Sequence, residues 1–318
     1  MSATLITMEK TDKILITGGT GLVGTALTNV LKGQEYENIL AINSKNVDLT
    51  DWNNTISFFK QEKPDYVFHL AATVYGIMGN MQNKGSSFLL NNWINTHVIE
   101  ASRLVGVKKI TAMGSGCVYP YPSPGIPLKE DMVWMGKPHQ SEDSYAHAKR
   151  AMLAQLNAYQ ESYGTEFAFV ISANLYGPND KFDKEFGHVT PALVRKFYEA
   201  KLNGSEVIVW GDGSSKRDFM YSQDAAEALT HIMAKIQGPV NLGSNMVHPI
   251  KDLVECLAEI TGLQDQVRWD TSKPNGQDFR SYDLNKLFNT GFKPTVSLPE
   301  GLKNTYTWYE NNAMSARK

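Results

Sequence analysis

The chain has 318 residues, of which 42% are hydrophobic and 20% charged, a composition typical of a globular protein. Lys and Arg number 31 against 33 Asp and Glu, and the resulting charge of −2 argues against nucleic acid or an anionic membrane as a main partner. The two cysteines, Cys117 and Cys256, lack the spacing of metal ligands, so no metal site is expected. Two lone thiols and the lack of a signal-peptide or membrane-span pattern favour a cytoplasmic location.

The first half of the chain alternates short apolar runs with longer helical patterns. Strands are expected at 13–19, 37–44, 64–72, 108–115 and 166–174. Helices are expected at 21–33, 52–63, 91–106 and 144–164. This alternation predicts an α/β fold of Rossmann type, with a doubly wound parallel sheet whose ligands bind at the carboxyl ends of the strands.

The alternation weakens after Tyr176, which predicts a smaller second lobe. Here the pattern predicts a hairpin over 205–221, one more helix and strand of the main sheet over 222–244, and outlying helices at 188–201 and 250–262. The expected NADP-binding Rossmann domain covers 11–175 plus about 221–243. The expected substrate-binding lobe, discontinuous in sequence, covers about 176–220 plus 244–312.

The first strand ends in the glycine-rich stretch "TGGTGLVG" (17–24), which also opens the first helix. Gly18, Gly21 and Gly24 have the spacing of a dinucleotide-binding turn, in which backbone N–H groups approach a pyrophosphate closely. Leu22 and Val23 belong to the same candidate site.

The end of the second strand, "AINSKNVDLTD", lacks the acidic residue that most NAD-binding proteins place there. Asn43, Ser44 and Lys45 instead offer donors and one positive charge, which suit the 2′-phosphate of NADP(H). Asp48 is close enough in sequence to contact the adenine edge.

The sequence "YAHAK" places Tyr145 and Lys149 one helical turn apart, on one face of the predicted helix. Ser115 ends the preceding strand. A phenol with an ordinary pKa near 10 needs a neighbouring cation to act as an acid or base at neutral pH, and Lys149 is expected to lower its pKa. Ser, Tyr and Lys in this arrangement resemble the active set of the short-chain dehydrogenase/reductase superfamily.

Six stretches extend this resemblance to the GDP-L-fucose synthase family, an extended branch of the superfamily, over about 13–309. They are "PDYVFHLAATVYGIMGN", "GSGCVYP", "SYAHAKR", "NLYGPNDKFDKEFGHVTPALVRKFYEAK", "VWGDGSSKRDF" and "DTSKPNG". The resemblance implies NADPH as cofactor, a GDP-sugar as substrate, 3,5-epimerase and 4-reductase activities, and a homodimer.

In that family a cysteine and a histidine serve the epimerisation, and they match Cys117 and His188. Protons at C3 and C5 are acidified by the C4 ketone, so one group can remove a proton and the other can return it to the opposite face. The resemblance implies further cofactor contacts at Leu70, Ala71, Ala72, Asn174 and His188. It implies substrate contacts at Ser115, Asn174, Lys196, Trp210, Arg217 and Lys273.

Three positions depart from the family pattern: Tyr75 and Gly116 replace a glycine and a serine, and Asn275 replaces an aspartate. These departures leave the sugar open, so reduction of a related GDP-4-keto sugar, such as a heptose or dideoxy sugar, is the main alternative. A redox-neutral nucleotide-sugar 4-epimerase and a catalytically silent nucleotide-binding protein are weaker alternatives. The presence of Ser115, Tyr145 and Lys149 argues against a silent protein.

Overall fold

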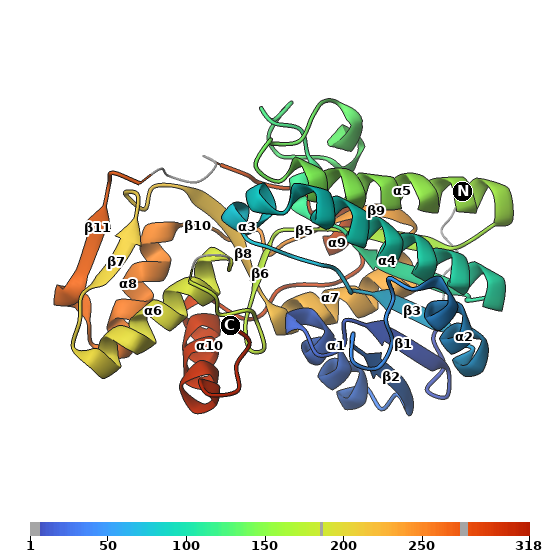
Figure 1. Cartoon of the computed structure of the whole chain (residues 1–318), viewed down its shortest axis with the longest axis horizontal. Helices are drawn as coiled ribbons and strands as arrows, with labels where there is room; N and C mark the ends of the chain where they lie inside the picture. Colours follow the sequence, from blue (N-terminus) through green and yellow to red (C-terminus); the bar gives the residue numbers. More distant parts are fainter. Residues whose placement is uncertain (1–6, 185–186, 274–278) are drawn as a thin grey trace.

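Six parallel strands form the central sheet, in the order β2-β1-β3-β4-β5-β9 (Figure 1). Their bounds are β1 Lys13–Thr17, β2 Asn38–Ile42, β3 Tyr66–His69, β4 Lys109–Met113, β5 Phe167–Ser172 and β9 Gly238–Leu242. The computed structural model describes residues 7–184, 187–273 and 279–318. The order reverses direction between β1 and β3, so a nucleotide-binding crevice is expected at the carboxyl ends of these two strands.

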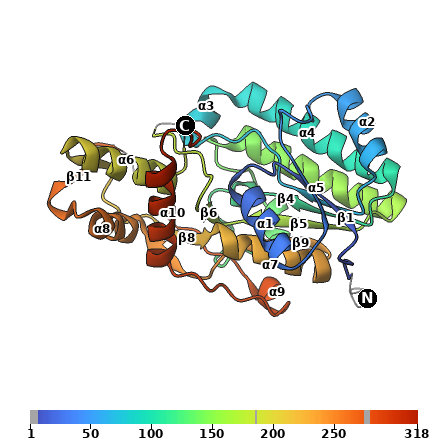
Figure 2. The ribbon, with the colours of Figure 1, turned by 90° about the horizontal axis from the view of Figure 1, so that it is seen from below.

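Helices cover both faces of this sheet (Figure 2). They are α1 Leu22–Gly33, α2 Trp52–Glu62, α4 Lys84–Val105, α5 Asp143–Tyr163 and α7 Ser222–Lys235. Buried side chains of α2, α4 and α5 pack in one apolar cluster with one face of the sheet, and those of α1 and α7 pack in another. Because the strands are buried on both faces, their sequences are nearly continuous apolar runs, which is why the pattern identifies them.

A buried lysine joins α7 to the sheet. Lys109 of β4 lies 2% exposed, and its Nζ donates to the carbonyl oxygens of Ile232, Met233 and Ile236 at 3.3, 2.6 and 2.7 Å. These carbonyls belong to the last turn of α7 and the residue that ends it, where the helix has no donors of its own. Burial lowers the pKa of Lys109 to about 8.

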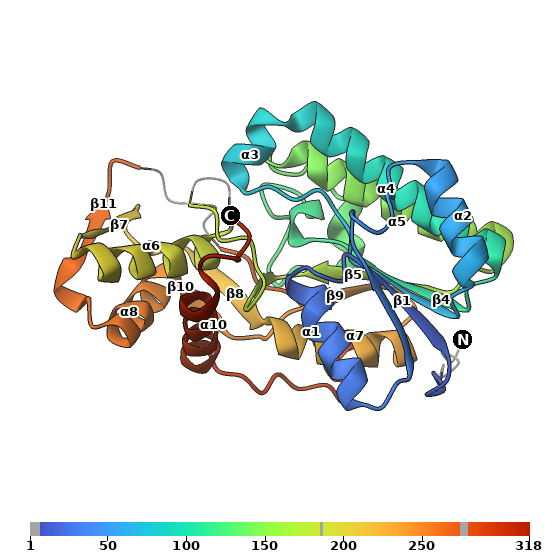
Figure 3. The same ribbon diagram turned by 60° about the horizontal axis from the view of Figure 1, so that its bottom comes forward.

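The smaller lobe lies beside the carboxyl ends of the strands and has a core of its own (Figure 3). Its strands are β6 Asn174–Tyr176, β7 Val207–Trp210, β8 Lys216–Tyr221, β10 Val247–Pro249 and β11 Val267–Asp270, and its longer helices are α6 Val189–Asn203, α8 Ile250–Thr261 and α10 Leu298–Asn312. The short helices of the molecule are α3 Ile77–Gln82 and α9 Asn285–Phe288, and the 3-10 turns are η1 Gly116–Val118, η2 Glu130–Trp134 and η3 Gln264–Gln266.

The predicted Rossmann-type α/β fold is confirmed, but the predicted hairpin over 205–221 is wrong. β7 pairs in parallel with β11, whereas β8 pairs with β6 and β10 in a different sheet. The turn between them packs Gly213 so tightly against Trp269 of β11 that an added Cβ would lie 2.5 Å from the indole ring. The turn before β8 therefore packs on β11, while β8 itself pairs in the other sheet.

Candidate active site

The glycine turn after β1 leaves no room for side chains at two of the three predicted positions. Gly18 has φ +71°, and an added Cβ would lie 3.0 Å from the backbone nitrogen of Ala71. A Cβ at Gly24 would lie 2.3 Å from the carbonyl oxygen of Gly18. Gly19 is not one of the three glycines of the motif but is equally constrained. An added Cβ there would lie 2.6 Å from the Cβ of Ala41 in β2.

Thr17 ties this turn to the end of β3. Its Oγ1 accepts hydrogen bonds from the backbone N–H groups of Leu70 and Ala71 at 3.2 Å each, and it lies 2.8 Å from Nδ1 of His69. Burial lowers the pKa of His69 to about 3, so the imidazole is neutral and has a structural role. The predicted cofactor residues Leu70, Ala71 and Ala72 are therefore held against the glycine turn.

The loop after β2 presents exposed polar groups next to the same turn. The Gly19 N–H donates to the carbonyl of Ile42 at 2.8 Å, which joins the two segments. Lys45 is exposed, and its backbone N–H donates to Oδ1 of Asn43 at 2.8 Å. Oδ1 of Asp48 accepts from the N–H and Oγ1 of Thr50 at 2.9 and 2.6 Å, and these hydrogen bonds lower the pKa of the carboxyl group.

Beyond the carboxyl end of β4, the predicted catalytic groups come together. Cys117, Tyr145 and Ala146 form one buried cluster, with Ala72 packed against it. The backbone N–H of Cys117 donates to Oγ of Ser115 at 3.4 Å, so the hydroxyl and the thiol belong to the same turn, η1. This arrangement places the Cys117 thiol directly beside Tyr145 and Ser115.

Lys149 lies beneath this cluster. Its Nζ donates to the carbonyl oxygen of Met113 at 2.8 Å and lies 5.7 Å from the ring centroid of Tyr145. Burial lowers the pKa of Lys149 to about 8. The expected lowering of the phenol pKa is not found: burial raises the pKa of Tyr145, with further contributions from Cys117 and Glu142.

Cys117 is only 3% exposed. Burial, together with the charge of Glu142, raises the pKa of its thiol to about 12, although Ser115, Arg280 and Lys149 act in the opposite direction. A buried thiol with a raised pKa is a weak base until positive charge stabilises its thiolate.

The structure also explains the departure at Gly116. An added Cβ there would lie 2.2 Å from the hydroxyl oxygen of Tyr282. Tyr282 therefore fills the place of the side chain that the family pattern puts at this position. Neither Tyr282 nor its neighbour Arg280 was predicted as a site residue, because both follow the substrate-lobe stretch "TSKPNG" without a local motif.

His188, the other predicted epimerisation residue, lies apart from this cluster. It is exposed and precedes the first turn of α6 in the smaller lobe. Within the described residues, no hydrogen bond joins its ring to Cys117 or Tyr145. Asp180, four residues beyond β6, is a buried carboxyl whose pKa is raised to about 6 by burial, with His188 and Arg317 acting in the opposite direction.

Three predicted substrate residues gather at the far side of the smaller lobe. The Nζ atoms of Lys196 and Lys273 lie 5.5 and 5.9 Å from the ring centroid of Trp210, which is 51% exposed. Two cations beside an exposed indole suit an anionic aromatic ligand such as a nucleotide. Arg217 lies on β8, opposite His248 of β10 and away from this indole.

The remaining predicted positions fall elsewhere. Asn174 is exposed at the start of β6. Tyr75 packs back on α3, where a Cβ on Gly79 would lie 2.8 Å from its own Cβ. Asn275 lies outside the described residues.

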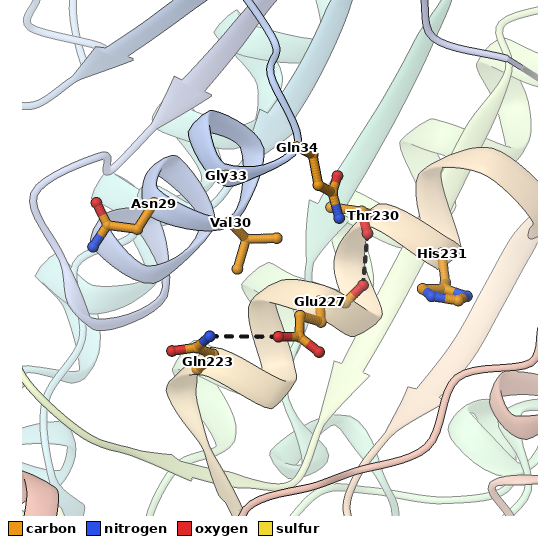
Figure 4. A pocket seen from close by; sticks show the side chains of 8 residues that line it. All are labelled: Asn29, Val30, Gly33, Gln34, Gln223, Glu227, Thr230 and His231. Carbon is orange, nitrogen blue, oxygen red and sulfur yellow. Dashed lines mark hydrogen bonds between the residues drawn. The ribbon is translucent and has the colours of Figure 1, made fainter.

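A groove of about 320 Å³ between α1 and α7 contains none of the predicted site residues (Figure 4). It is lined by Asn29, Val30, Gly33, Gln34, Gln223, Glu227, Thr230 and His231. It lies on the opposite face of the sheet from α5, so the catalytic cluster does not open into it. In the parts of the chain that the structure describes, no cluster of three or more His, Cys, Asp or Glu residues could hold a metal ion.

None of the helices among the described residues has the length and hydrophobicity needed to span a bilayer. The parallel sheet, the glycine turn and the Ser–Tyr–Lys set define an extended short-chain dehydrogenase/reductase. The family model for the NAD dependent epimerase/dehydratase family matches residues 14–243.

Similarity to known proteins identifies the family within this class. The chain is 38% identical over 314 residues to the putative GDP-L-fucose synthase 2 of Arabidopsis thaliana, covering 98% of this chain and 95% of that protein. A GDP-L-fucose synthetase from Naegleria fowleri, solved bound to NADP, is 33% identical, has a TM-score of 0.92, and covers 99% of this chain and 97% of its own. A GDP-6-OMe-4-keto-L-xylo-heptose reductase from C. jejuni is 29% identical, has a TM-score of 0.90, and covers 96% and 99%. The chain therefore belongs to the NAD dependent epimerase/dehydratase family and, within it, to the GDP-L-fucose synthases.

Proposed function

We propose that this chain is an NADPH-dependent 3,5-epimerase and 4-reductase that converts GDP-4-keto-6-deoxy-D-mannose into GDP-L-fucose. The observation that carries the proposal is the packing of Cys117 against Tyr145, beside Ser115 and Lys149. Reduction alone needs the Ser, Tyr and Lys side chains, whereas a thiol packed among them is needed only for a further step such as epimerisation.

The residues of the glycine turn and of the loop after β2 fit the cofactor. Gly18 and Gly24 keep the backbone open for a pyrophosphate, and exposed Lys45 would hold a 2′-phosphate beside Asn43 and Ser44. When bound, NADPH supplies the hydride that reaches C4 of the sugar.

Side chains of this protein carry out the proposed proton transfers. In its thiolate form, Cys117 takes a proton from the carbon next to the ketone and becomes a thiol, while the charge moves to the enolate oxygen. His188 in its protonated form returns a proton to the opposite face, which requires the smaller lobe to bring it toward the sugar. After epimerisation, the Tyr145 hydroxyl would give its proton to O4 as the ketone is reduced, and Ser115 would donate a hydrogen bond to that oxygen.

We propose the same division of the chain as the sequence suggests. Residues 11–175 and about 221–243 bind the cofactor, and about 176–220 and 244–312 bind the sugar nucleotide. Lys196, Trp210 and Lys273 are the proposed nucleotide contacts, supported by their proximity to one another. Arg217 and Asn174 are proposed to contact the diphosphate and the sugar.

The decisive experiment uses GDP-4-keto-6-deoxy-D-mannose and NADPH in D₂O, with the product sugar identified by NMR. The proposal expects GDP-L-fucose carrying deuterium at C3 and C5. In Cys117→Ser, which replaces a thiol of ordinary pKa near 8.5 by a much weaker base, deuterium should no longer enter. Native exchange in Cys117→Ser would refute the proposed role of the thiol.

The alternative function is a C4-reductase of a related GDP-4-keto sugar. The close packing of the Tyr282 hydroxyl against Gly116 favours this alternative, because it alters the turn that carries Cys117. The same NMR assay with a GDP-4-keto-heptose separates the two. Faster reduction of the heptose without deuterium at C3 or C5 would support the alternative.

We also propose a homodimer formed through α4 and α5. The two helices pack on one face of the sheet, and α4 exposes Phe88, Leu89 and Trp93 by 44%, 45% and 43%. Three adjacent exposed apolar side chains are typical of a buried interface between copies. Light scattering should give twice the mass of one chain, and Trp93→Glu should give the monomer. The free thiols support a cytoplasmic location for the enzyme.

A further inference from the structure

Residues 279–283, here called the strap, connect the two lobes at the catalytic cluster. Phe279 pairs with Lys216 of β8, in the smaller lobe. Three residues on, the strap pairs with Leu128: the Leu128 N–H donates to the carbonyl of Ser281, and the Asp283 N–H donates to the carbonyl of Leu128, both at 2.9 Å. Because both ends are hydrogen-bonded, side chains between them are held in place.

Two side chains of the strap face the catalytic cluster. The hydroxyl of Tyr282 abuts Gly116, at the start of the turn that carries Cys117. Arg280 is largely buried, with 13% of its side chain exposed, and its Nη2 lies 3.4 Å from Oε1 of Glu142. The strap therefore brings a largely buried cation to Glu142, the residue that precedes α5.

Glu142 links this ion pair to the catalytic helix. It immediately precedes α5, and its backbone carbonyl accepts from the N–H of Ala146 at 2.9 Å. Ala146 packs in the same buried cluster as Cys117 and Tyr145. The position of Arg280 is thus fixed relative to both the thiol and the phenol.

The titratable and charged groups that act on Cys117 come from two elements. Glu142, Tyr145, Lys149 and Arg150 belong to α5 or directly precede it, and Arg280 belongs to the strap. Burial and Glu142 raise the pKa of the thiol, while Arg280 and Lys149 lower it. Lys149 belongs to α5 and donates to the carbonyl of Met113. Arg280 is a cation that acts on the thiol from outside α5.

We propose that Arg280 is a positioning residue for epimerisation, which stabilises the Cys117 thiolate and is held in place by the paired strap. The inference rests on the proposed role of Cys117 as the base. The proton moves from the sugar carbon to sulfur, so the negative charge leaves the thiolate as the enolate forms, and no further reactant is needed. Arg280 favours the state from which that step begins.

The test measures the thiol itself before any activity. In a Cys256→Ser background, which leaves Cys117 as the single thiol, the rate of its alkylation by iodoacetamide at a fixed pH follows the thiolate fraction. Arg280→Met should slow alkylation about tenfold, which corresponds to a rise of about one pKa unit. Arg280→Lys keeps the charge and should stay near the native rate, whereas Glu142→Gln should speed alkylation.

Arg103→Met is the matched control, because Arg103 forms a comparable ion pair with Glu100 on α4, at 2.7 Å. It should leave the alkylation rate unchanged. The second readout is deuterium exchange at C3 and C5 with the GDP-keto sugar, which should fall about tenfold in Arg280→Met and recover in Arg280→Lys. NADPH oxidation with a ketone that needs no epimerisation should change much less.

A native alkylation rate in folded Arg280→Met would overturn the proposal, and so would slower alkylation in Glu142→Gln. If Arg280→Met does not fold, the opposed predictions for Arg280→Lys and Glu142→Gln still decide the question. If the native enzyme exchanges no sugar proton at all, the proposed function fails, while the alkylation rates still report whether Arg280 supports the thiolate.

Discussion

The contact between Gly116 and Tyr282 predicts how much one added methyl group at position 116 would destabilise the fold. In Gly116→Ala the new carbon would lie 2.2 Å from the Tyr282 hydroxyl oxygen and 3.2 Å from the carbonyl oxygen of Ser172. Neither neighbour can easily withdraw, because Tyr282 belongs to the paired strap and Ser172 ends a central strand. Overpacking of this kind typically costs about 1–3 kcal/mol of the free energy of unfolding.

The assay is equilibrium unfolding in urea. Tyr282→Phe removes the clashing oxygen and leaves its ring carbon at 3.2 Å, so the double variant Gly116→Ala with Tyr282→Phe should regain most of the loss. Gly33→Ala is the control, since an added Cβ there meets nothing within 4 Å at the end of α1. Native stability in Gly116→Ala, or no recovery in the double variant, would refute the reasoning.

Four further substitutions test other parts of the structure. Tyr145→Phe removes the proposed proton donor to O4, and NADPH oxidation with the keto sugar should fall ~10²–10⁴-fold. Lys45→Ala should weaken NADPH binding by about 1–3 kcal/mol in a fluorescence titration and leave NADH binding unchanged. Lys109→Met leaves three carbonyl oxygens at the end of α7 without their donor, and the free energy of unfolding in urea should fall by about 3 kcal/mol. Burial raises the pKa of Asp180 from 3.8 to about 6, so between these values the folded state keeps a proton that the unfolded chain has lost, and the contribution of this group to stability falls as pH rises. Asp180→Asn should therefore stabilise the protein more at pH 8 than at pH 5, by about 1 kcal/mol in thermal unfolding.

The sequence predicts those parts of the fold in which local pattern and tertiary burial agree. Strands such as β3 and β4 are buried on both faces, so apolar residues predominate in each. The glycine turn has a local signal too, because Gly18 is needed for its φ of +71° and Gly24 for its close contacts with Gly18 and Gly19. The pattern fails at β7 and β8, where two neighbouring strands join different sheets, since strand pairing depends on distant partners.

The candidate site divides in the same way. Ser115, Cys117, Tyr145 and Lys149 lie in two short motifs, and the sheet brings these together at the end of β4. The strap could not be predicted, because the fit of Tyr282 to Gly116 joins positions far apart in sequence and involves no pattern of its own. The departure at Gly116 was the one local signal, and it shows only that some other group fills the space.

The proposed mechanism requires opposite protonation states of Tyr145 and Cys117, which share one buried cluster. The proposed reduction requires Tyr145 to keep its proton until it passes to O4, and burial, which raises the pKa of the phenol, favours this. The proposed epimerisation requires Cys117 to lose its proton, and the same burial, which raises the thiol pKa to about 12, works against it. Because Cys117 and Tyr145 share one buried cluster, a change in solvent access would shift both pKa values in the same direction. Only charges placed unequally about the two groups can favour the thiolate while the phenol stays protonated. Glu142 raises the pKa of both groups, whereas Arg280 lowers that of the thiol from the strap, so Arg280 favours the thiolate where burial cannot.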